Sequence, residues 1–334
     1  MRVAISGLNN TDNPAPGVPV AKSLKGHNLI GLSYDVNEPG IYQGIFEKVY
    51  LMPFPNVGWE DTKERLLEIK RKSDIEAVIP NLDAELPLYI KNQEELKRLG
   101  INTFLPSLKN FEMREKRCLP EFVKKLGVKH PKTIEVISLD DLVKAVKEIG
   151  LPVMVKGNYY KAYMAYSLDE AIEYFYKISN EWGFPLLVQE VVKGVEINYV
   201  GLANKELFGG VGIKKLTTTD LGKVWSAVSI DNKKLIDLAH KFVEISEWRG
   251  AFELEAIASG DDIYLIEINP RFPAWVYFAT MLGVNLPQMM VDIMQGREVE
   301  KKLTYPCEKL YVRYVDEVMR DFSDFTKLLT QKEL

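Results

Sequence analysis

Two glutamates, Glu255 and Glu267, stand twelve residues apart in a stretch that has the pattern of a β-hairpin. Residues 251–258 and 263–269 have strand character, and a Ser-Gly-Asp-Asp segment typical of a turn separates them. Pairing centred near Asp261 places the two glutamates opposite each other on one face of the hairpin. The sequence therefore predicts two carboxylates within reach of one bound ion.

The same register makes this face of the hairpin strongly acidic. Glu253 falls opposite Asn269, while apolar residues such as Leu254 and Ile268 point to the other face. Like charges that face each other destabilise a sheet, so a compensating cation is expected. Oxygen ligands favour Mg²⁺, which commonly takes one or two carboxylates together with nucleotide phosphates. The alternative is an acidic face that water solvates.

The composition is that of a globular protein with two or three packed subdomains. Its formal charge of -4 gives no reason to expect nucleic acid as the main partner. The first residues have too short an apolar stretch for a secretory signal, and no apolar run is long enough to span a membrane. We therefore expect a cytoplasmic protein without a membrane partner. The scattered cysteines and histidines argue against a disulfide framework, a zinc site and a Ser/His/Asp triad.

Residues 1–107 alternate strands and helices in the manner of a doubly wound α/β domain. Functional groups gather at the carboxyl ends of such strands, which makes Asp83 and Glu85 candidate substrate contacts, although Asp83 could equally cap the following helix. No GxGxxG follows the first strand, so nicotinamide or flavin binding has no sequence support. The expected strands are 3–6, 29–33, 48–51 and 75–79, and the expected helices are 18–24, 59–72 and 85–99.

Two further parts follow along the chain. Residues 108–185 are predicted to form a linker helix and a small α+β layer, and residues 186–334 a larger antiparallel unit. The smaller part has expected helices at 110–126, 139–149 and 168–181 and strands at 133–137 and 153–156. The larger part has strands from residue 186 onward, helices at 232–247 and 283–296, the acidic hairpin, a strand at 310–314 and a peripheral helix in the tail 317–334.

Two segments have residues suited to a nucleotide. Lys156 ends an apolar strand, where its ammonium could meet a phosphate, although a lysine that simply reaches water fits equally well. The strand that contains Gln189 could offer backbone groups to a purine, and Glu196 could take the ribose hydroxyls.

In order and spacing, these segments resemble the ATP-grasp superfamily along nearly the whole chain. The resemblance is most specific at Glu255 and at Glu267-Ile268-Asn269-Pro270-Arg271, which looks like that family's metal-binding strand pair ending in E-x-N-x-R. It implies that Glu255, Glu267 and Asn269 bind Mg²⁺, with Glu267 bridging two ions. It also implies that Arg271 contacts the transferred phosphoryl group or the reactive intermediate.

The resemblance implies an ATP-grasp fold that combines α/β and α+β parts. Residues 1–107 would be a pre-ATP-grasp domain, 108–185 a linker helix and small lid subdomain, and 186–334 the large subdomain. The Ile-Pro-Asn-Leu-Asp-Ala-Glu segment at 79–85 resembles the pre-ATP-grasp domain of carbamoyl-phosphate-synthase-like and carboxylate-amine ligase members.

The resemblance also implies a set of nucleotide contacts. Two lysines would hold phosphates, a glutamine and two backbone groups would contact adenine, and a glutamate would bind the ribose. In that order these are Lys116 and Lys156, Gln189 with the backbone of Glu190 and Val192, and Glu196. Apart from the resemblance, Lys116 fits a solvated helix lysine equally well.

The loop after Lys156 departs from the family pattern. Many ATP-grasp enzymes have a glycine-rich loop there, whereas residues 157–164 keep one glycine, so Lys161 and tyrosine side chains would cover the nucleotide. Lys214 and Lys215 lie on a strand that in the family often supplies a further cation to the γ-phosphate or the substrate carboxylate. Strand alternation lets only one of the two face the site.

The predicted function is that of an ATP-dependent carboxylate-amine ligase, which forms an amide or peptide bond through an acyl phosphate and releases ADP and phosphate. Its cofactors are ATP and Mg²⁺, with Mn²⁺ as an alternative metal. Its substrates are a small-molecule or peptide carboxylate and an amine, and a homodimer and a carrier or partner protein fit the family.

Two other functions stay open at this point. One is carboxyphosphate or carbamoyl-phosphate chemistry with bicarbonate, which the lack of duplicated synthase halves and of a biotin-carrier segment disfavours. The other is a nucleotide-binding sensor without turnover, which the glycine-poor loop suggests.

Overall fold

The structure is a computed structural model that describes residues 1–115, 118–157 and 161–334. Its contacts divide the chain into two compact units. The first unit comprises Met1–Arg114, Ile197–Leu254 and Ile268–Leu334, and the second comprises Glu115–Glu196 and Glu255–Glu267. The division into three parts at residues 107 and 185 stays a prediction.

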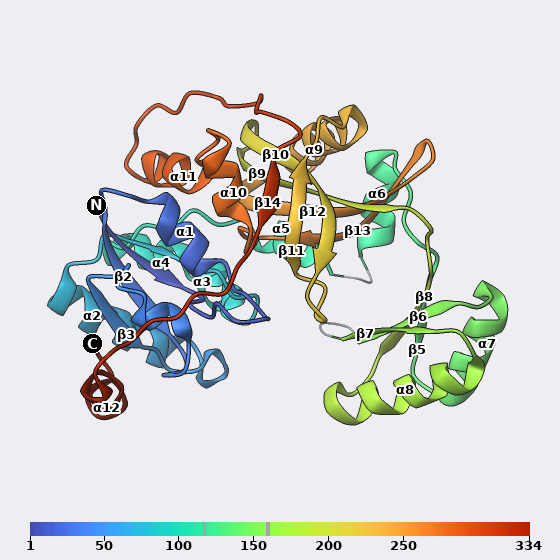
Figure 1. The fold of residues 1–334 in the computed structure, drawn as a ribbon, viewed down its shortest axis with the longest axis horizontal. Coiled ribbons are helices and arrows are strands. Elements are labelled where there is room, and N and C mark those ends of the chain that lie inside the picture. The colour runs from blue at the N-terminus through green and yellow to red at the C-terminus, as the bar shows by residue number, and fades with distance from the viewer. Residues whose placement is uncertain (116–117, 158–160) are drawn as a thin grey trace. The chain divides into compact units, whose positions relative to one another are not determined.

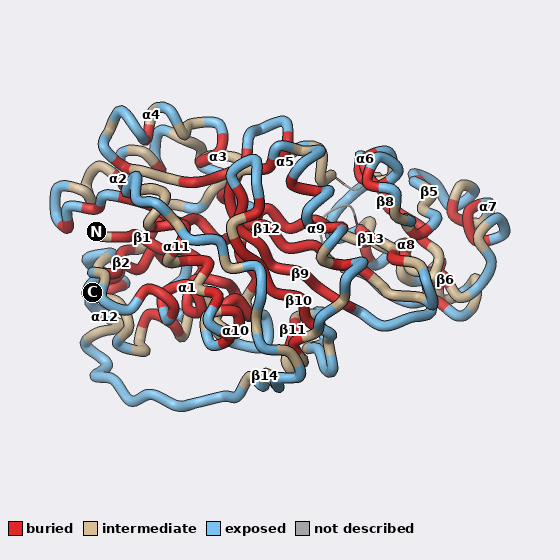
Figure 2. Tube along the Cα trace, turned by 90° about the horizontal axis from the view of Figure 1, so that it is seen from above, coloured by how far each residue is buried: buried red, intermediate tan, exposed pale blue. Residues whose placement is uncertain are grey.

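A four-stranded parallel sheet with the order β3-β2-β1-β4 forms the N-terminal part of the first unit (Figure 1). The traces of β1 and β2 are almost wholly buried (Figure 2), as expected of parallel strands that are covered on both faces. The predicted α/β class is confirmed, although the strand expected at 75–79 begins at Ala77. The elements are β1 (Arg2–Ser6), α1 (Gly17–Ser23), β2 (Asn28–Ser33), η1 (Pro39–Tyr42), β3 (Lys48–Leu51), η2 (Pro55–Val57), α2 (Trp59–Ser73) and β4 (Ala77–Ile79).

Two helices that the sequence predicts as continuous are each divided. The segment 85–99 forms α3 (Leu86–Lys91) and α4 (Gln93–Arg98), which Asn92 separates. The segment 110–126 forms α5 (Leu108–Met113) and α6 (Leu119–Leu126), with Pro120 in the first turn of α6. A proline is tolerated in a first turn but removes a hydrogen bond from a helix interior. The prediction of one linker helix was wrong because it passed through this proline.

The second sheet has six strands in the order β13-β12-β9-β10-β11-β14. The pairs β9–β10, β10–β11 and β11–β14 are antiparallel, as predicted for this part of the chain. The strands are β9 (Val195–Asn204), β10 (Leu207–Thr218), β11 (Val224–Ser229), β12 (Arg249–Ser259), β13 (Asp262–Asn269) and β14 (Leu310–Val312). The helices of this region are α9 (Lys233–Ser246), α10 (Val276–Met281) and α11 (Leu286–Met294).

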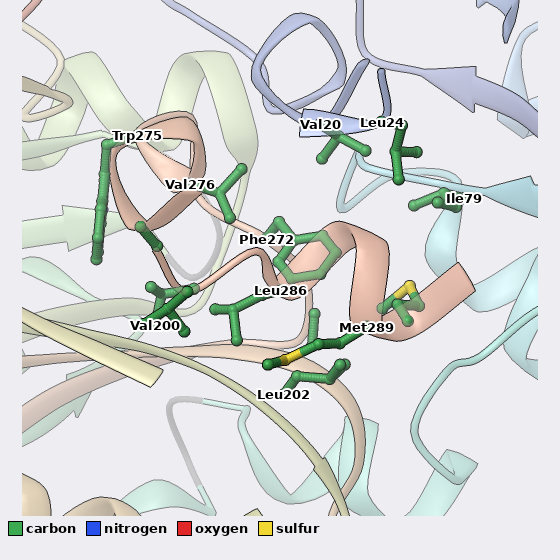
Figure 3. Close-up of a cluster of buried hydrophobic side chains, with 14 of the residues drawn as sticks. Val20, Leu24, Ile79, Val200, Leu202, Phe272, Trp275, Val276, Leu286 and Met289 are labelled. Carbon is green, nitrogen blue, oxygen red and sulfur yellow. The ribbon is translucent and has the colours of Figure 1, made fainter. Parts of the chain in front are cut away.

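The core of the first unit joins the antiparallel strands to the segment that follows β13. Val200 and Leu202 of β9 belong to one buried cluster with Phe272 and Trp275, and Figure 3 shows Phe272 near the middle of this cluster. An added Cβ at Gly201 would lie 2.4 Å from the Phe252 ring, so any larger residue there would force the strand or the ring to shift. The chain immediately after Asn269 and Arg271 is therefore anchored by close packing.

The second unit contains a four-stranded antiparallel sheet with the order β5-β8-β6-β7. Helices α7 and α8 contact each other and pack against this sheet. Ser138 and Ser167 cap these two helices by accepting backbone N–H groups. The predicted α+β layer is confirmed, with β7 as a strand that the sequence pattern did not predict. Its elements are β5 (Thr133–Val136), α7 (Leu139–Ile149), β6 (Val153–Gly157), β7 (Ala162–Ala165), α8 (Leu168–Trp182) and β8 (Leu186–Glu190).

The C-terminal tail returns to the parallel sheet of the first unit. Helix α12 (Phe322–Gln331) buries Leu328, and Leu334 then exchanges two backbone hydrogen bonds of 2.8 Å with Val49 of β3. The tail was predicted as a peripheral helix from residue 317, but the helix begins at Phe322 and the last residues extend the edge of the sheet. Among the described residues, no helix has the length and apolar character needed to cross a bilayer.

Candidate functional site

The acidic hairpin forms where the sequence predicts it. Strands β12 and β13 are neighbours in the six-stranded sheet, and Gly260 adopts a φ of 57° in the turn between them. Glu255 and Glu267 are half-buried, and Asn269 at the end of β13 is buried. The placement of Glu255 directly opposite Glu267 stays a prediction.

Glu253, which the sequence reasoning left without a role, contacts Asn269. Its side chain is 3% exposed, and its Oε2 accepts a hydrogen bond of 3.0 Å from Asn269 Nδ2. Its Oε1 accepts hydrogen bonds from Asn198 Nδ2 at 2.8 Å and from Trp275 Nε1 at 2.7 Å. The carboxylate therefore links β9 and β12 to the end of β13 and the start of α10.

Arg271 is held by Asp83, a residue 188 positions away in the sequence. Its Nε and Nη2 donate to Asp83 Oδ2 at 3.0 and 2.7 Å, and the Arg271 side chain is 10% exposed. Burial alone would raise the pKa of Asp83, but the nearby guanidinium groups of Arg271 and Arg114 hold it below its usual value. A charged Asp83 thus fixes Arg271, for which the resemblance predicts contact with the transferred phosphoryl group.

Glu85 has a different surrounding from Asp83. Its carboxylate is fully buried, accepts hydrogen bonds from the hydroxyls of Ser6 and Tyr34, and also accepts the backbone N–H groups of Asn81 and Leu82. Burial raises its pKa, although these hydrogen bonds lower it. These contacts join the carboxyl ends of neighbouring parallel strands, so Asp83 is the better candidate for contact with a substrate.

In the second unit, Lys156 and Gln189 lie together. Lys156 Nζ donates to Gln189 Oε1 at 2.6 Å, and Gln189 Nε2 donates to Thr133 Oγ1 at 2.8 Å. Residues 154 and 189 are register partners in the β6–β8 pair, which places Lys156 two residues along the strand from Gln189's partner. The glutamine, predicted to contact adenine, therefore directs its side chain to the predicted phosphate lysine.

The other predicted nucleotide residues lie on several elements, with Glu190 at the end of β8, Val192 just after it and Glu196 in β9. Glu190 and Val192 are half-buried, and Glu196 is exposed. Lys161 is exposed and has a φ of 68°, while its carbonyl accepts the Gly157 N–H at 3.1 Å. Lys116 lies outside the described residues. The nucleotide roles of this set stay predictions.

Strand alternation distinguishes Lys214 from Lys215. Lys214 is exposed, whereas Lys215 is half-buried and shares the sheet face of buried Ile213. Lys215 is therefore the better candidate for the further cation.

Two arginines that the sequence does not single out also lie in the first unit, and one of them contacts a candidate residue. Arg114 Nη2 lies 3.7 Å from Asp83 Oδ1, and Arg313 donates to Asn10 Oδ1 at 2.8 Å and to the Ala274 carbonyl at 2.7 Å. No local motif marks either one. Arg313 thereby joins the segment after β1 to the segment after β13.

Glu255, Glu267 and Asn269 fit Mg²⁺ by the chemistry of their donors, two carboxylates and a carboxamide oxygen. The contact between Glu253 and the nitrogen of Asn269 supports this fit because it leaves Asn269 Oδ1 on the other side of the amide. Within the described ranges, no three His, Cys, Asp or Glu side chains gather as a metal cluster. The proposed site differs from such a cluster because a carboxamide and nucleotide oxygens would complete its ligands. The assignment of Mg²⁺ to Glu255, Glu267 and Asn269 stays a prediction.

Comparison with known proteins identifies the fold. Residues 185–318 match a family model described as ATP-grasp in the biosynthetic pathway with Ter operon. Over 90% of its length, the chain superposes with a TM-score of 0.66 and 16% identity on 71% of the biotin carboxylase domain of Hydrogenobacter thermophilus 2-oxoglutarate carboxylase. The chain has the ATP-grasp fold. Its predicted resemblance to the ATP-grasp superfamily is confirmed.

Two further proteins show the range of similarity. The L-amino acid ligase of Bacillus licheniformis has a TM-score of 0.65 and 15% identity, over 88% of this chain and 74% of its own. The large chain of Clostridium acetobutylicum carbamoyl phosphate synthase is 23% identical over 72% of this chain. The present chain covers only 24% of that curated relative. ATP-grasp enzymes use ATP and Mg²⁺, and Mn²⁺ has no support from these comparisons.

Proposed function

We propose that this ATP-grasp chain is a carboxylate-amine ligase that joins an acid to an amine through an acyl phosphate. The observation that carries the proposal is the segment from Glu267 to Arg271. Two of its side chains are held in place by carboxylates from elsewhere in the first unit, Asn269 by Glu253 and Arg271 by Asp83. Fixed polar side chains of this kind suit a site that stabilises charge in a transition state.

In the proposed reaction, a carboxylate oxygen of the acid attacks the γ-phosphorus of ATP, and ADP leaves. The amine then attacks the acyl carbon, phosphate leaves, and the amine nitrogen loses a proton. Bound Mg²⁺ supplies charge neutralisation of the triphosphate. Arg271 adds positive charge at the transferred phosphoryl group, where one well-placed donor is worth about 3 kcal/mol of barrier. A carboxylate is already a nucleophile at neutral pH, so the first step needs no base.

Lys156 on β6 is a proposed phosphate contact. Gln189 Oε1 holds its ammonium at 2.6 Å, which limits the rotamers that this flexible side chain can adopt. In this proposal Gln189 orients Lys156 and does not itself contact the nucleotide. The backbone groups of Glu190 and Val192 contact the adenine.

The proposal is tested by phosphate release. Purified protein is incubated with ATP, Mg²⁺ and pools of amino acids and short peptides, and products are identified by mass spectrometry. Phosphate release that requires both an acid and an amine, with an amide product, is the expected result. Tight ATP binding without turnover across all pools would contradict the ligase and favour a nucleotide sensor.

A second candidate is carboxyphosphate chemistry with bicarbonate as the acid. It is favoured by the similarity to the carbamoyl phosphate synthase large chain and to a biotin carboxylase domain that was crystallised with MgADP, ADP and bicarbonate. Phosphate release that depends on bicarbonate and not on an organic acid distinguishes this candidate.

A homodimer and a carrier protein for the substrate are further proposals. Sedimentation tests the homodimer, and co-purification tests the carrier protein.

A further inference from the structure

We propose that Glu253 is a positioning residue that sets the orientation of the Asn269 carboxamide toward the metal. The proposal rests on the proposed function, since it takes Asn269 Oδ1 as a metal ligand. It adds a residue that lies outside the E-x-N-x-R segment and that has no place among the predicted ligands.

The chemistry of the two side chains determines which atom of Asn269 faces Glu253. A carboxylate can only accept hydrogen bonds, so the atom of Asn269 that lies 3.0 Å from Glu253 Oε2 is the amide nitrogen. The amide oxygen then points away from Glu253. An amide without such a neighbour could present either atom, and its nitrogen would repel a cation.

Burial makes this choice of orientation firm. Glu253 is 3% exposed and Asn269 is 7% exposed, so little water is present to replace the hydrogen bond if the amide rotates. A buried donor left without a partner costs about 1–3 kcal/mol. The rotated amide would in addition bring its oxygen against a carboxylate oxygen.

The opposite oxygen of Glu253 explains why the carboxylate itself stays in place. Oε1 accepts from Asn198 on β9 and from Trp275 at the start of α10. Trp275 is packed in the buried cluster of the first unit (Figure 3), so the carboxylate is tied to the core. Glu253 thus restrains Asn269 at the end of β13, because Glu253 is itself held by residues of the core.

A single isosteric substitution distinguishes a role of Glu253 in orienting Asn269 from a role in core packing. In Glu253→Gln, the side-chain oxygen is expected to stay with the two donors Asn198 and Trp275, which turns the new amide nitrogen toward Asn269. Two amide nitrogens cannot hydrogen-bond to each other, so Asn269 should rotate by half a turn and present its nitrogen to the metal. The volume and the contacts with Asn198 and Trp275 are retained.

The experiment measures Mg²⁺ affinity in the presence of ADP by calorimetry, together with thermal unfolding and the ¹⁵N-indole NMR signal of Trp275. Glu253→Gln should lower Mg²⁺ affinity by about 10- to 100-fold, the range seen when partners of metal ligands are removed. The Trp275 indole signal should show that its hydrogen bond remains. Unchanged Mg²⁺ affinity in this variant would overturn the proposal.

A double variant provides the rescue. Glu253→Gln combined with Asn269→Asp exchanges the two groups, because the glutamine nitrogen can donate to the aspartate, whose other oxygen then faces the metal. We expect this variant to regain most of the Mg²⁺ affinity, whereas Asn269→Asp alone sets two carboxylates against each other and should unfold at a lower temperature. A folded double variant that binds Mg²⁺ no better than Glu253→Gln would count against a positioning role. If the single variant does not fold, the Mg²⁺ affinity of the double variant alone tests the proposal.

Trp275→Phe is the matched control, since it removes a donor from the other oxygen of Glu253 and leaves the Asn269 contact. Its Mg²⁺ affinity should stay within about twofold of wild type, well short of the loss expected for a partner of a metal ligand. A loss equal to that of Glu253→Gln would mean that Glu253 acts only through the core. Wild-type protein that binds no Mg²⁺ with ADP would instead remove the metal site, and with it the proposed function.

Discussion

Two buried glutamates in the first unit, Glu85 and Glu253, receive hydrogen bonds from different kinds of partner. Glu85 binds backbone N–H groups and the Ser6 hydroxyl through one oxygen and the Tyr34 hydroxyl through the other. Glu253 binds two nitrogens through one oxygen and the amide nitrogen of Asn269 through the other. Both are buried carboxylates without an arginine or lysine among these partners.

The difference lies in what the partner of the second oxygen can do. A tyrosine hydroxyl either donates or accepts, so it can adapt if the group opposite changes. An amide nitrogen only donates, so Asn269 must turn over when its acceptor is lost. A carboxylate facing a hydroxyl therefore serves the fold, whereas one facing an amide also determines which atom that amide shows to a ligand.

The largest expected effect comes from a third glutamate, Glu267, which we propose as a ligand of the metal itself. Glu267→Gln removes a ligand charge at nearly constant volume, so turnover should fall by at least about 10³-fold while the unfolding temperature changes little. Steady-state phosphate release and thermal unfolding check this. Near wild-type turnover in the variant would contradict the metal assignment and leave Glu253 with a structural role only.

Substitutions at Glu85 test whether the Tyr34 hydroxyl can accept a hydrogen bond when the carboxylate opposite it is replaced. Glu85→Leu leaves two backbone N–H groups and two hydroxyls without their acceptor, which should lower the free energy of unfolding by about 3 kcal/mol. Glu85→Gln should cost less than about 1 kcal/mol, since Tyr34 can accept from the new amide. Urea denaturation measures both. Equal losses in the two variants would show that the hydroxyl does not adapt.

Asp83 extends the comparison to a carboxylate whose partners are charged. Asp83→Asn should lower the free energy of unfolding at pH 7 by about 1–2 kcal/mol, because Arg271 loses its ion pair at a partly exposed site. The pKa of Asp83 is lowered in the folded state, so this contribution is present above the unfolded value of 3.8 and is lost as the pH falls through the folded value. Denaturation at pH 7 and at pH 3 should show the variant and wild type converging in acid.

The smallest expected effect concerns Glu38, whose contribution to stability changes with pH in the direction opposite to that of Asp83. Burial raises the pKa of Glu38 to about 7, although its hydrogen bond from Ser33 lowers it. Because the folded state holds this proton more tightly, wild-type stability should decrease as the pH rises from about 4.5 to about 7, by roughly 1 kcal/mol after allowance for solvent. Glu38→Gln should remove this part of the pH dependence. A variant that keeps the full slope would assign it to another group, such as Glu85.

Much of the hairpin follows from short-range pattern. Alternating strands around a Ser-Gly-Asp-Asp turn predict β12 and β13, and the spacing of Glu255, Glu267 and Asn269 predicts that they share one face of the hairpin. The helix at 110–126 fails for an equally local reason, since Pro120 in the sequence already forbids a continuous helix there. These features depend on residues that are neighbours in the chain.

The sequence by itself determined the two kinds of sheet, the acidic hairpin and the resemblance to the ATP-grasp superfamily. Only the tertiary structure decided that Asp83 holds Arg271, that Gln189 turns to Lys156, and that Glu253 faces the nitrogen of Asn269. Backbone periodicity and turn chemistry act over a few residues, so they can be recognised along the chain. The atom that a side chain presents is set by partners 16 to 188 positions away, which meet only when the core has packed.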